Sequence, residues 1–141
     1  MILWNAELAR RLSCTKREKT HIGDIIKELL SVHALARTEG IKALVDSAAA
    51  KDKPVLSHGL RLIQDGVSGE TLEEILAIYL ITSSWTGLEF LTQCLQTEAL
   101  LSLAAGDSRD VFLQKLVPYC GVDQAAEVLA SLGDGRDGGS L

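Results

Sequence analysis

Apolar side chains recur at steps of three and four residues along most of this chain, and that spacing constrains the fold more than any other feature. Residues at these steps share one face of an α-helix, so the pattern predicts amphipathic helices that pack against one another. Aromatic residues make up only 4% of the chain, and few apolar runs alternate with polar residues as strands do. The sequence therefore predicts an all-α fold, a compact bundle of about six to seven helices with short loops.

Residues that commonly begin or end helices divide the pattern into segments. Trp4, Leu8 and Leu12 predict a short N-terminal amphipathic helix, followed by a charged linker that completes a segment over 1–19. Thr20 is the expected N-cap of the next helix, which either ends at Gly40 or continues to Ala50. The remaining helices are expected over 55–63, 68–82, 88–105, 108–118 and 123–132. Either Asp107 or Ser108 is the expected N-cap of the helix over 108–118. The apolar stripe of the helix over 68–82 is expected to consist of Leu72, Ile75, Leu76, Tyr79 and Leu80.

These helices are expected to form one domain over 20–132, because the chain has 141 residues and 47% hydrophobic content. The glycine-rich tail over 133–141 is predicted to be disordered, since it has little apolar surface to bury. The longest uncharged stretch, Ile75 to Leu88, is shorter than the roughly 18 apolar residues that suggest a membrane span. We expect it to form a buried core helix.

Charge and cysteine content limit the class of partner and the compartment. Fourteen Lys and Arg residues against nineteen Asp and Glu give a formal charge of −5, which offers no attraction to nucleic acid or an anionic membrane. The expected partner is a protein. Cys14, Cys94 and Cys120 are widely and irregularly spaced, which favours reduced thiols in the cytoplasm.

Candidate chemical groups do not form a catalytic, cofactor or metal motif. His21, His33 and His58 are twelve and twenty-five residues apart, without a paired cysteine motif nearby. His33 lies on or beside an apolar stripe and is expected to be a partly buried core residue, whereas His58 is expected in a loop or at a helix end. Cys94 is expected to be a small buried hydrophobe. The sequence thus predicts a protein that is not an enzyme.

Two stretches resemble cytoplasmic parts of motility protein A, the A subunit of the flagellar stator. The first contains Leu35 to Leu44 (LARTEGIKAL), then Pro54 to Gly66 and Leu72 to Leu76, similar in order to the family patterns ARxEGLLAL, FLxxGLxLxxDG and IxxIL. The second runs from Glu98 to Asp107 and on to Leu116, similar to EGxLSIxxGxNP and EKL. Together they cover about two thirds of the chain.

The resemblance implies a soluble, stator-like relative. The family's membrane helices, two of which separate these stretches and line its ion path, have no counterpart here, which excludes ion conduction. Arg37 matches the family's basic residue used against the rotor's switch protein, and the acidic partner position holds Val45, with Asp46 one place later. Ala99 and Ser108-Arg109 replace the family's usual Gly and Asn-Pro.

Our leading hypothesis is therefore a noncatalytic helical protein of the flagellar motor, located in the cytoplasm. Its expected partner-binding residues are Arg37, Glu39, Asp46 and Trp85. The alternative is a general helical adaptor or homo-oligomerisation module unrelated to motility, with Trp4 and Trp85 as interface anchors. Self-association is expected in either case, because the N-terminal helix and the Ile75 to Leu88 stretch offer more apolar surface than a small domain can bury.

Overall fold

The computed structural model describes residues 10–11, 14–47 and 50–140, and all of the regular secondary structure in these ranges is helical. The all-α fold predicted from the apolar spacing is confirmed. The elements in chain order are α2 (Lys16–Lys19), α3 (Ile22–Glu39), α4 (Ile41–Val45), α5 (Pro54–Gln64), α6 (Gly69–Thr82), α7 (Gly87–Ala104), α8 (Arg109–Leu116), the 3₁₀ helix η2 (Val117–Cys120) and α9 (Val122–Ser140). The predicted N-terminal helix lies almost entirely outside the described residues.

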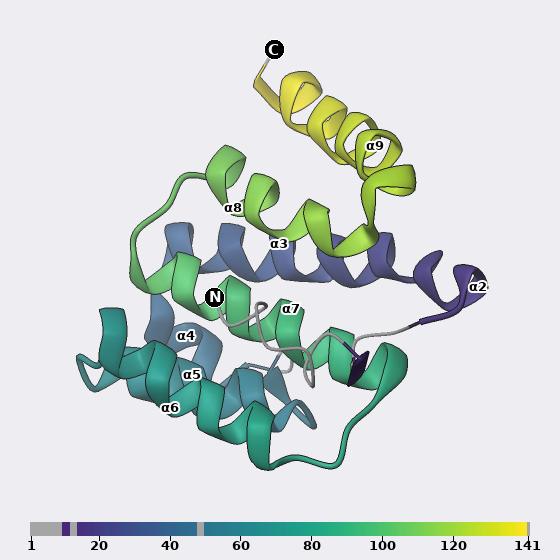
Figure 1. The fold of residues 1–141 in the computed structure, drawn as a ribbon. Coiled ribbons are helices and arrows are strands. Elements are labelled where there is room, and N and C mark those ends of the chain that lie inside the picture. The colour runs from purple at the N-terminus through teal and green to yellow at the C-terminus, as the bar shows by residue number, and fades with distance from the viewer. Residues whose placement is uncertain (1–9, 12–13, 48–49, 141) are drawn as a thin grey trace.

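The central helix is α7, which packs against α3 and α8 on one side and against α5 and α6 on the other (Figure 1). Its buried residues belong to two core clusters. Leu95 and Ala99 pack with apolar side chains of α3 and α8, whereas Leu100 packs with those of α4, α5 and α6. A helix that is apolar on more than one side is stable only when it is covered on those sides. Burial of α7 therefore joins the two halves of the bundle.

Several helix boundaries lie at the Gly, Pro and Ser residues from which they were predicted. Gly40 decides between the two lengths considered for the second helix: α3 ends at Glu39, and Gly40 has φ of +88°, a conformation that favours glycine. A separate short helix, α4, follows it. Pro54 occupies the first turn of α5, where its missing N–H costs no intrahelical hydrogen bond. Ser108 caps α8, because its hydroxyl accepts a hydrogen bond from the Val111 amide.

The predicted charged linker before residue 20 is wrong for its second half. Lys16–Lys19 form the short helix α2, with Thr15 as its N-cap. The Thr15 hydroxyl accepts from the Glu18 amide, and the Glu18 carboxylate accepts from the Thr15 amide, 3.0 Å away. This reciprocal capping box satisfies two amides that would otherwise lack partners. It also displaces the predicted N-cap, since α3 begins after His21 and not after Thr20.

The C-terminal helix is longer than the sequence predicted. We expected a helix that ended at Leu132 and a disordered tail, and α9 instead has helical backbone from Val122 to Ser140. Once a helix has been nucleated, each added residue gains one backbone hydrogen bond, so a helix can extend through residues of poor propensity. The helix lies at the edge of the bundle, where it contacts η2 and α8 (Figure 1).

Candidate protein-binding surface

Helix α6 carries exposed apolar side chains close to its C-terminal end. Ile78 is 54% exposed, Tyr79 41% and Ile81 55%. We call these three residues the α6 face. The other large hydrophobic residues exposed in the described part of the chain, Val111 and Val122, belong to different helices. Side chains of this size gathered within one turn of a helix are typical of a surface that another molecule covers.

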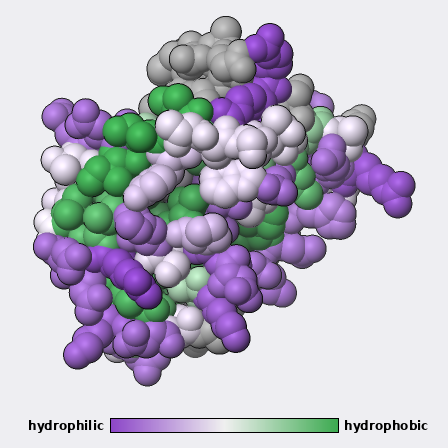
Figure 2. All heavy atoms as spheres, turned by 90° about the horizontal axis from the view of Figure 1, so that it is seen from below, coloured by the Kyte–Doolittle hydropathy of each residue, from purple (hydrophilic) through white to green (hydrophobic). Residues whose placement is uncertain are grey.

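The helical period explains why this face is exposed. Leu72, Leu76 and Leu80 recur at four-residue steps and are completely buried between α6 and the rest of the bundle. Ile78 and Ile81 point away from this stripe and reach solvent. The view onto the lower side of the bundle shows hydrophobic side chains gathered beside a border of hydrophilic ones (Figure 2).

The buried core helix expected over Ile75 to Leu88 is only partly correct, because Leu76 and Leu80 are buried whereas the α6 face is exposed. The helix ends at Thr82, and an extended connection leads from there to α7. Tyr79 was placed on the buried stripe, yet its ring lies at the surface beside α5. The uncharged stretch thus contains both core residues, Leu76 and Leu80, and exposed apolar residues, and composition alone does not separate these two cases.

A side-chain pair joins the α6 face to α5. The Tyr79 hydroxyl lies 2.8 Å from Nε2 of His58, and the two rings make an edge contact with centroids 5.0 Å apart. His58 lies inside α5, not in the loop or at the helix end predicted for it. This contact holds the tyrosine ring over the α5–α6 seam. The α6 face thus includes one side chain of defined orientation.

Arg11 fastens the N-terminal part of the chain to the end of α6. Its guanidinium donates to the carbonyl oxygens of Ser83 and Trp85, at 2.8 and 3.0 Å from Nη2, and to the Ser83 hydroxyl at 2.7 Å. Its central carbon lies 4.2 Å from the centroid of the Phe90 ring. A planar guanidinium provides several fixed donors and a face that stacks on aromatic rings. Arg11 therefore makes specific structural contacts and is not a solvated basic residue of the N-terminal segment over 1–19.

The predicted partner-binding residues do not form one site. Arg37 and Glu39 are exposed at the end of α3, and Asp46 is exposed where α4 ends. Trp85 is only partly exposed, in the connection between α6 and α7, where its side chain packs against two core clusters. That connection and the α3–α4 corner lie on different sides of the bundle (Figure 1). Arg37, Glu39 and Asp46 thus share one corner, and Trp85 belongs to the region of the α6 face.

A polar cluster around Asp107 ties three helices together. The Asp107 carboxylate accepts from the Ser102 hydroxyl at 2.7 Å and forms an ion pair with Lys115. These two donors hold the pKa of Asp107 below its ordinary value. The backbone carbonyl of the same residue lies 2.9 Å from Nε2 of His33, a buried histidine of α3 that stacks beside Phe112. The prediction that His33 belongs to the core is confirmed.

The other reactive side chains lie in structural settings. Cys94 is 1% exposed, as predicted, and burial raises the pKa of its thiol to about 12. Burial and the neighbouring Glu98 carboxylate raise the pKa of Tyr119, whose hydroxyl donates to Glu98 at 3.0 Å. The Cys94 thiol is therefore not ionised at neutral pH and is a poor nucleophile. Within the ranges given above, His, Cys, Asp and Glu side chains do not gather in threes that could hold a metal ion.

Two further results bear on the class of protein. Among the described helices, none has both the length and the apolar content that crossing a bilayer requires. Comparison of the chain with protein-family models, curated proteins and solved structures found no match.

Proposed function

We propose that this chain is a noncatalytic protein-interaction domain that binds a protein partner through the α6 face. The observation that carries the proposal is the exposure of Ile78 and Ile81, each more than half accessible to solvent on one helix. Covering apolar area of this kind contributes roughly 25 cal/mol per Å² before the costs of association are subtracted. Tyr79 adds a ring with a polar tip, a residue type enriched at interfaces.

The partner that we propose is a component of the flagellar motor, with the chain acting in the cytoplasm. The support is the resemblance together with the position of the α6 face. The first matched stretch ends at Leu76 and the second begins at Glu98, and in motility protein A membrane helices lie between them. The α6 face begins two residues after Leu76. Apolar side chains are thus exposed at the place where the resembling family continues into its membrane helices.

The α3–α4 corner is the second proposed contact. Arg37, Glu39 and Asp46 are all exposed there and carry charges of both signs. Exposed charges at the rim of an interface mainly set the rate of association and the choice of partner, and they contribute little affinity. We therefore expect Arg37→Glu to slow binding and make it less dependent on salt, whereas changes in the α6 face remove binding.

Affinity capture with the full chain as bait in a flagellated bacterium tests this proposal. We expect the unmodified chain to recover motor proteins, and Ile78→Glu/Ile81→Glu to recover them at least about tenfold less. Val111→Glu is the matched control, because Val111 is a 42% exposed hydrophobic residue on α8. Recovery without any motor protein would contradict the motor assignment. Equal recovery by the double variant would contradict the α6 face.

A general adaptor or homo-oligomer remains the second candidate, and one observation favours it. The α6 face contains no charged side chain, so two copies can place their faces together without opposing like charges at its centre. The homo-oligomer differs from the first candidate in needing no protein other than a second copy of this chain. Its test is the oligomeric state of the purified chain.

A further inference from the structure

Arg11 fixes the place from which residues 1–9 leave the described part of the chain. Its Nη1 lies 3.4 Å from the carbonyl oxygen of Ile81, and its Nη2 donates to the carbonyl oxygens of Ser83 and Trp85 at 2.8 and 3.0 Å. Ile81 itself belongs to the α6 face. The residues that precede Arg11 therefore begin within the length of one arginine side chain of this face.

Residues 1–9 are long enough to cover the α6 face. A segment of this length spans about 13 Å as a helix, at roughly 1.5 Å per residue, and about 30 Å when it is extended. The face is shorter, because Ile78 and Ile81 belong to one turn of α6 and are separated by a rise of about 4.5 Å. Either form of the segment reaches from Arg11 across the whole face.

The composition of residues 1–9 matches that of the face. The segment reads Met-Ile-Leu-Trp-Asn-Ala-Glu-Leu-Ala, and Glu7 is its one charged side chain. The spacing predicts that Trp4 and Leu8 share one side of a helix. The three residues of the α6 face are also uncharged, so contact between such apolar surfaces desolvates no charged group. Tryptophan is, in addition, a residue type that commonly anchors interfaces.

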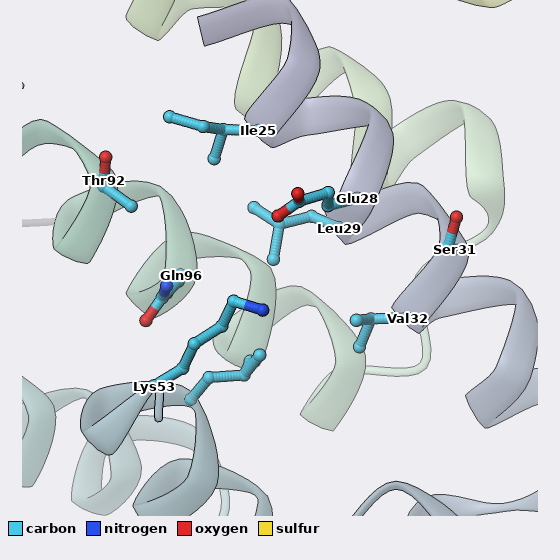
Figure 3. Close-up of a pocket in the computed structure, with 9 residues that line it drawn as sticks. Ile25, Glu28, Leu29, Ser31, Val32, Lys53, Thr92 and Gln96 are labelled. Atoms are coloured by element: carbon cyan, nitrogen blue, oxygen red, sulfur yellow. The ribbon is translucent and has the colours of Figure 1, made fainter. Parts of the chain in front are cut away.

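The apolar pocket between α3, the start of α5 and α7 is a poorer place for this segment (Figure 3). Its volume of about 290 Å³ suits a small molecule and not a peptide of this length. Thr92 lines the pocket, whereas Phe90 contacts Arg11. Residues two positions apart in a helix point about 200° apart, so the pocket lies on the opposite side of α7 from Arg11. The charged side chains of Glu28 and Lys53 also line it.

We infer that residues 1–9 fold back onto the α6 face and cover it in competition with a partner. Because Arg11 holds the segment beside the face, its effective concentration there is of the order of 1 mM. A contact with a Kd of about 0.1 mM between separate molecules is then about 90% formed within one chain. A partner binds only the uncovered fraction, so its apparent affinity falls about tenfold. This effect on a partner rests on the proposed function, whereas the covering itself does not.

Fluorescence of Trp4 tests the covering without any partner. Trp85→Phe leaves Trp4 as the one tryptophan of the full chain, and acrylamide quenching measures its accessibility. We expect quenching at least about threefold weaker than that of N-acetyltryptophanamide, because the covered fraction shields the ring. Ile78→Glu/Ile81→Glu should restore strong quenching. Val111→Glu, on α8, is the matched control and should not.

A second measurement keeps Trp85, whose side chain packs against two core clusters. In the otherwise unmodified chain, Trp4→Ala should shift the NMR signals of the Ile78 and Ile81 methyl groups, because an aromatic ring no longer lies against them. Asn5→Ala, in the same segment, is the control and should leave these signals in place.

Three results would overturn the inference. The first is a Trp4 that is quenched as strongly as N-acetyltryptophanamide, with methyl signals that do not move in Trp4→Ala. The second is protection of Trp4 that survives Ile78→Glu/Ile81→Glu, which would place the segment elsewhere. The third is protection that appears only as the protein concentration rises, which would make a second copy the occupant of the face.

Affinity capture separates this inference from the proposed function. Trp4→Glu should recover about tenfold more of the partner than the unmodified chain, since it leaves the α6 face uncovered. Equal or lower recovery would contradict competition between the segment and the partner. Recovery of no motor protein by either chain would contradict the motor assignment, and the quenching of Trp4 would still decide whether residues 1–9 cover the face.

Discussion

Asp107 shows how one residue can join three helices. Its carboxylate accepts a hydrogen bond from the Ser102 hydroxyl of α7 and forms an ion pair with Lys115 of α8. Its backbone carbonyl lies within hydrogen-bond distance of the His33 ring of α3. Ser102 is completely buried, so its hydroxyl depends on this carboxylate for an acceptor. From the sequence, Asp107 is predicted only to lie at the start of a helix. Its contact with His33, seventy-four positions away, depends on the packing of α3 against α8 and is not encoded in any local pattern.

The charge of Asp107 makes stability depend on pH. Folding lowers the pKa of this carboxyl. Its contribution to the free energy of unfolding is therefore fully present above the unfolded pKa of about 4, and it is lost as pH falls through the folded pKa. We expect Asp107→Asn to be less stable than the unmodified chain by about 1 kcal/mol at pH 7, a value reduced by the partial exposure of Lys115. The difference should shrink as pH falls below about 4, and urea unfolding at a series of pH values measures it. Asp123→Asn, at an exposed position, is the control, and a difference that stays constant with pH would contradict this account.

Arg11 is the second residue whose role exceeds its local context. Arg11→Met removes the donors to Ser83 and Trp85 and the contact with Phe90, and we expect a loss of about 2 kcal/mol. Arg11→Lys should recover little of it, because an ammonium does not reproduce the planar fork. Hydrogen exchange of the amides over 83–90 should accelerate in both variants. Arg17→Met, at an exposed position of α2, should leave stability and exchange unchanged.

At the scale of the element, Gly59 permits the close approach of α5 and α7. A Cβ at this position would lie 2.3 Å from Cδ1 and 2.9 Å from Cδ2 of Leu100, a completely buried side chain. Gly59→Ala should therefore lower the free energy of unfolding by about 1–3 kcal/mol, although alanine has the higher helix propensity. Gly23→Ala in α3 is the matched control. Its Cβ would be 4.0 Å from Val128, so we expect a gain of up to about 1 kcal/mol. Thermal or urea unfolding measures both, and equal effects would contradict the proposed contact.

Helix type and several helix ends could be predicted because their causes are local. The 3.6-residue stripe, Pro54 at the start of α5 and Ser108 at the start of α8 act within one turn of chain. The capping box of Thr15 and Glu18 was also visible in the sequence as a Thr-x-x-Glu spacing. It was missed because the lysines and arginine around it suggested a linker. The capping box determines that α2 is a helix, whereas the high charge of the segment led to the wrong prediction of a linker.

At the scale of the whole molecule, the candidate sites depend on which faces the bundle leaves open. The stripe of α6 was correct at Leu72, Leu76 and Leu80, yet an uncharged sequence does not reveal which apolar residues α7 covers. A pocket between α3, α5 and α7 is lined by Glu28, Lys53 and Gln96, which come from three separate parts of the chain. Neither the α6 face nor this pocket corresponds to a sequence motif of fixed spacing, so neither could be predicted from the sequence.

The last prediction concerns the oligomeric state. If the α6 face pairs with a second copy, the mass measured by sedimentation should rise with protein concentration. The net charge of −5 opposes association of like copies, and added salt screens this repulsion while it leaves apolar contact intact. Self-association should therefore strengthen between about 0.05 and 0.5 M salt, whereas an interface of ion pairs at Arg37, Glu39 and Asp46 would weaken. Ile78→Glu/Ile81→Glu should remain monomeric, with Val111→Glu as control. If the unmodified chain stays monomeric at high concentration and high salt, self-association is refuted, and the α6 face is then expected to bind a different protein.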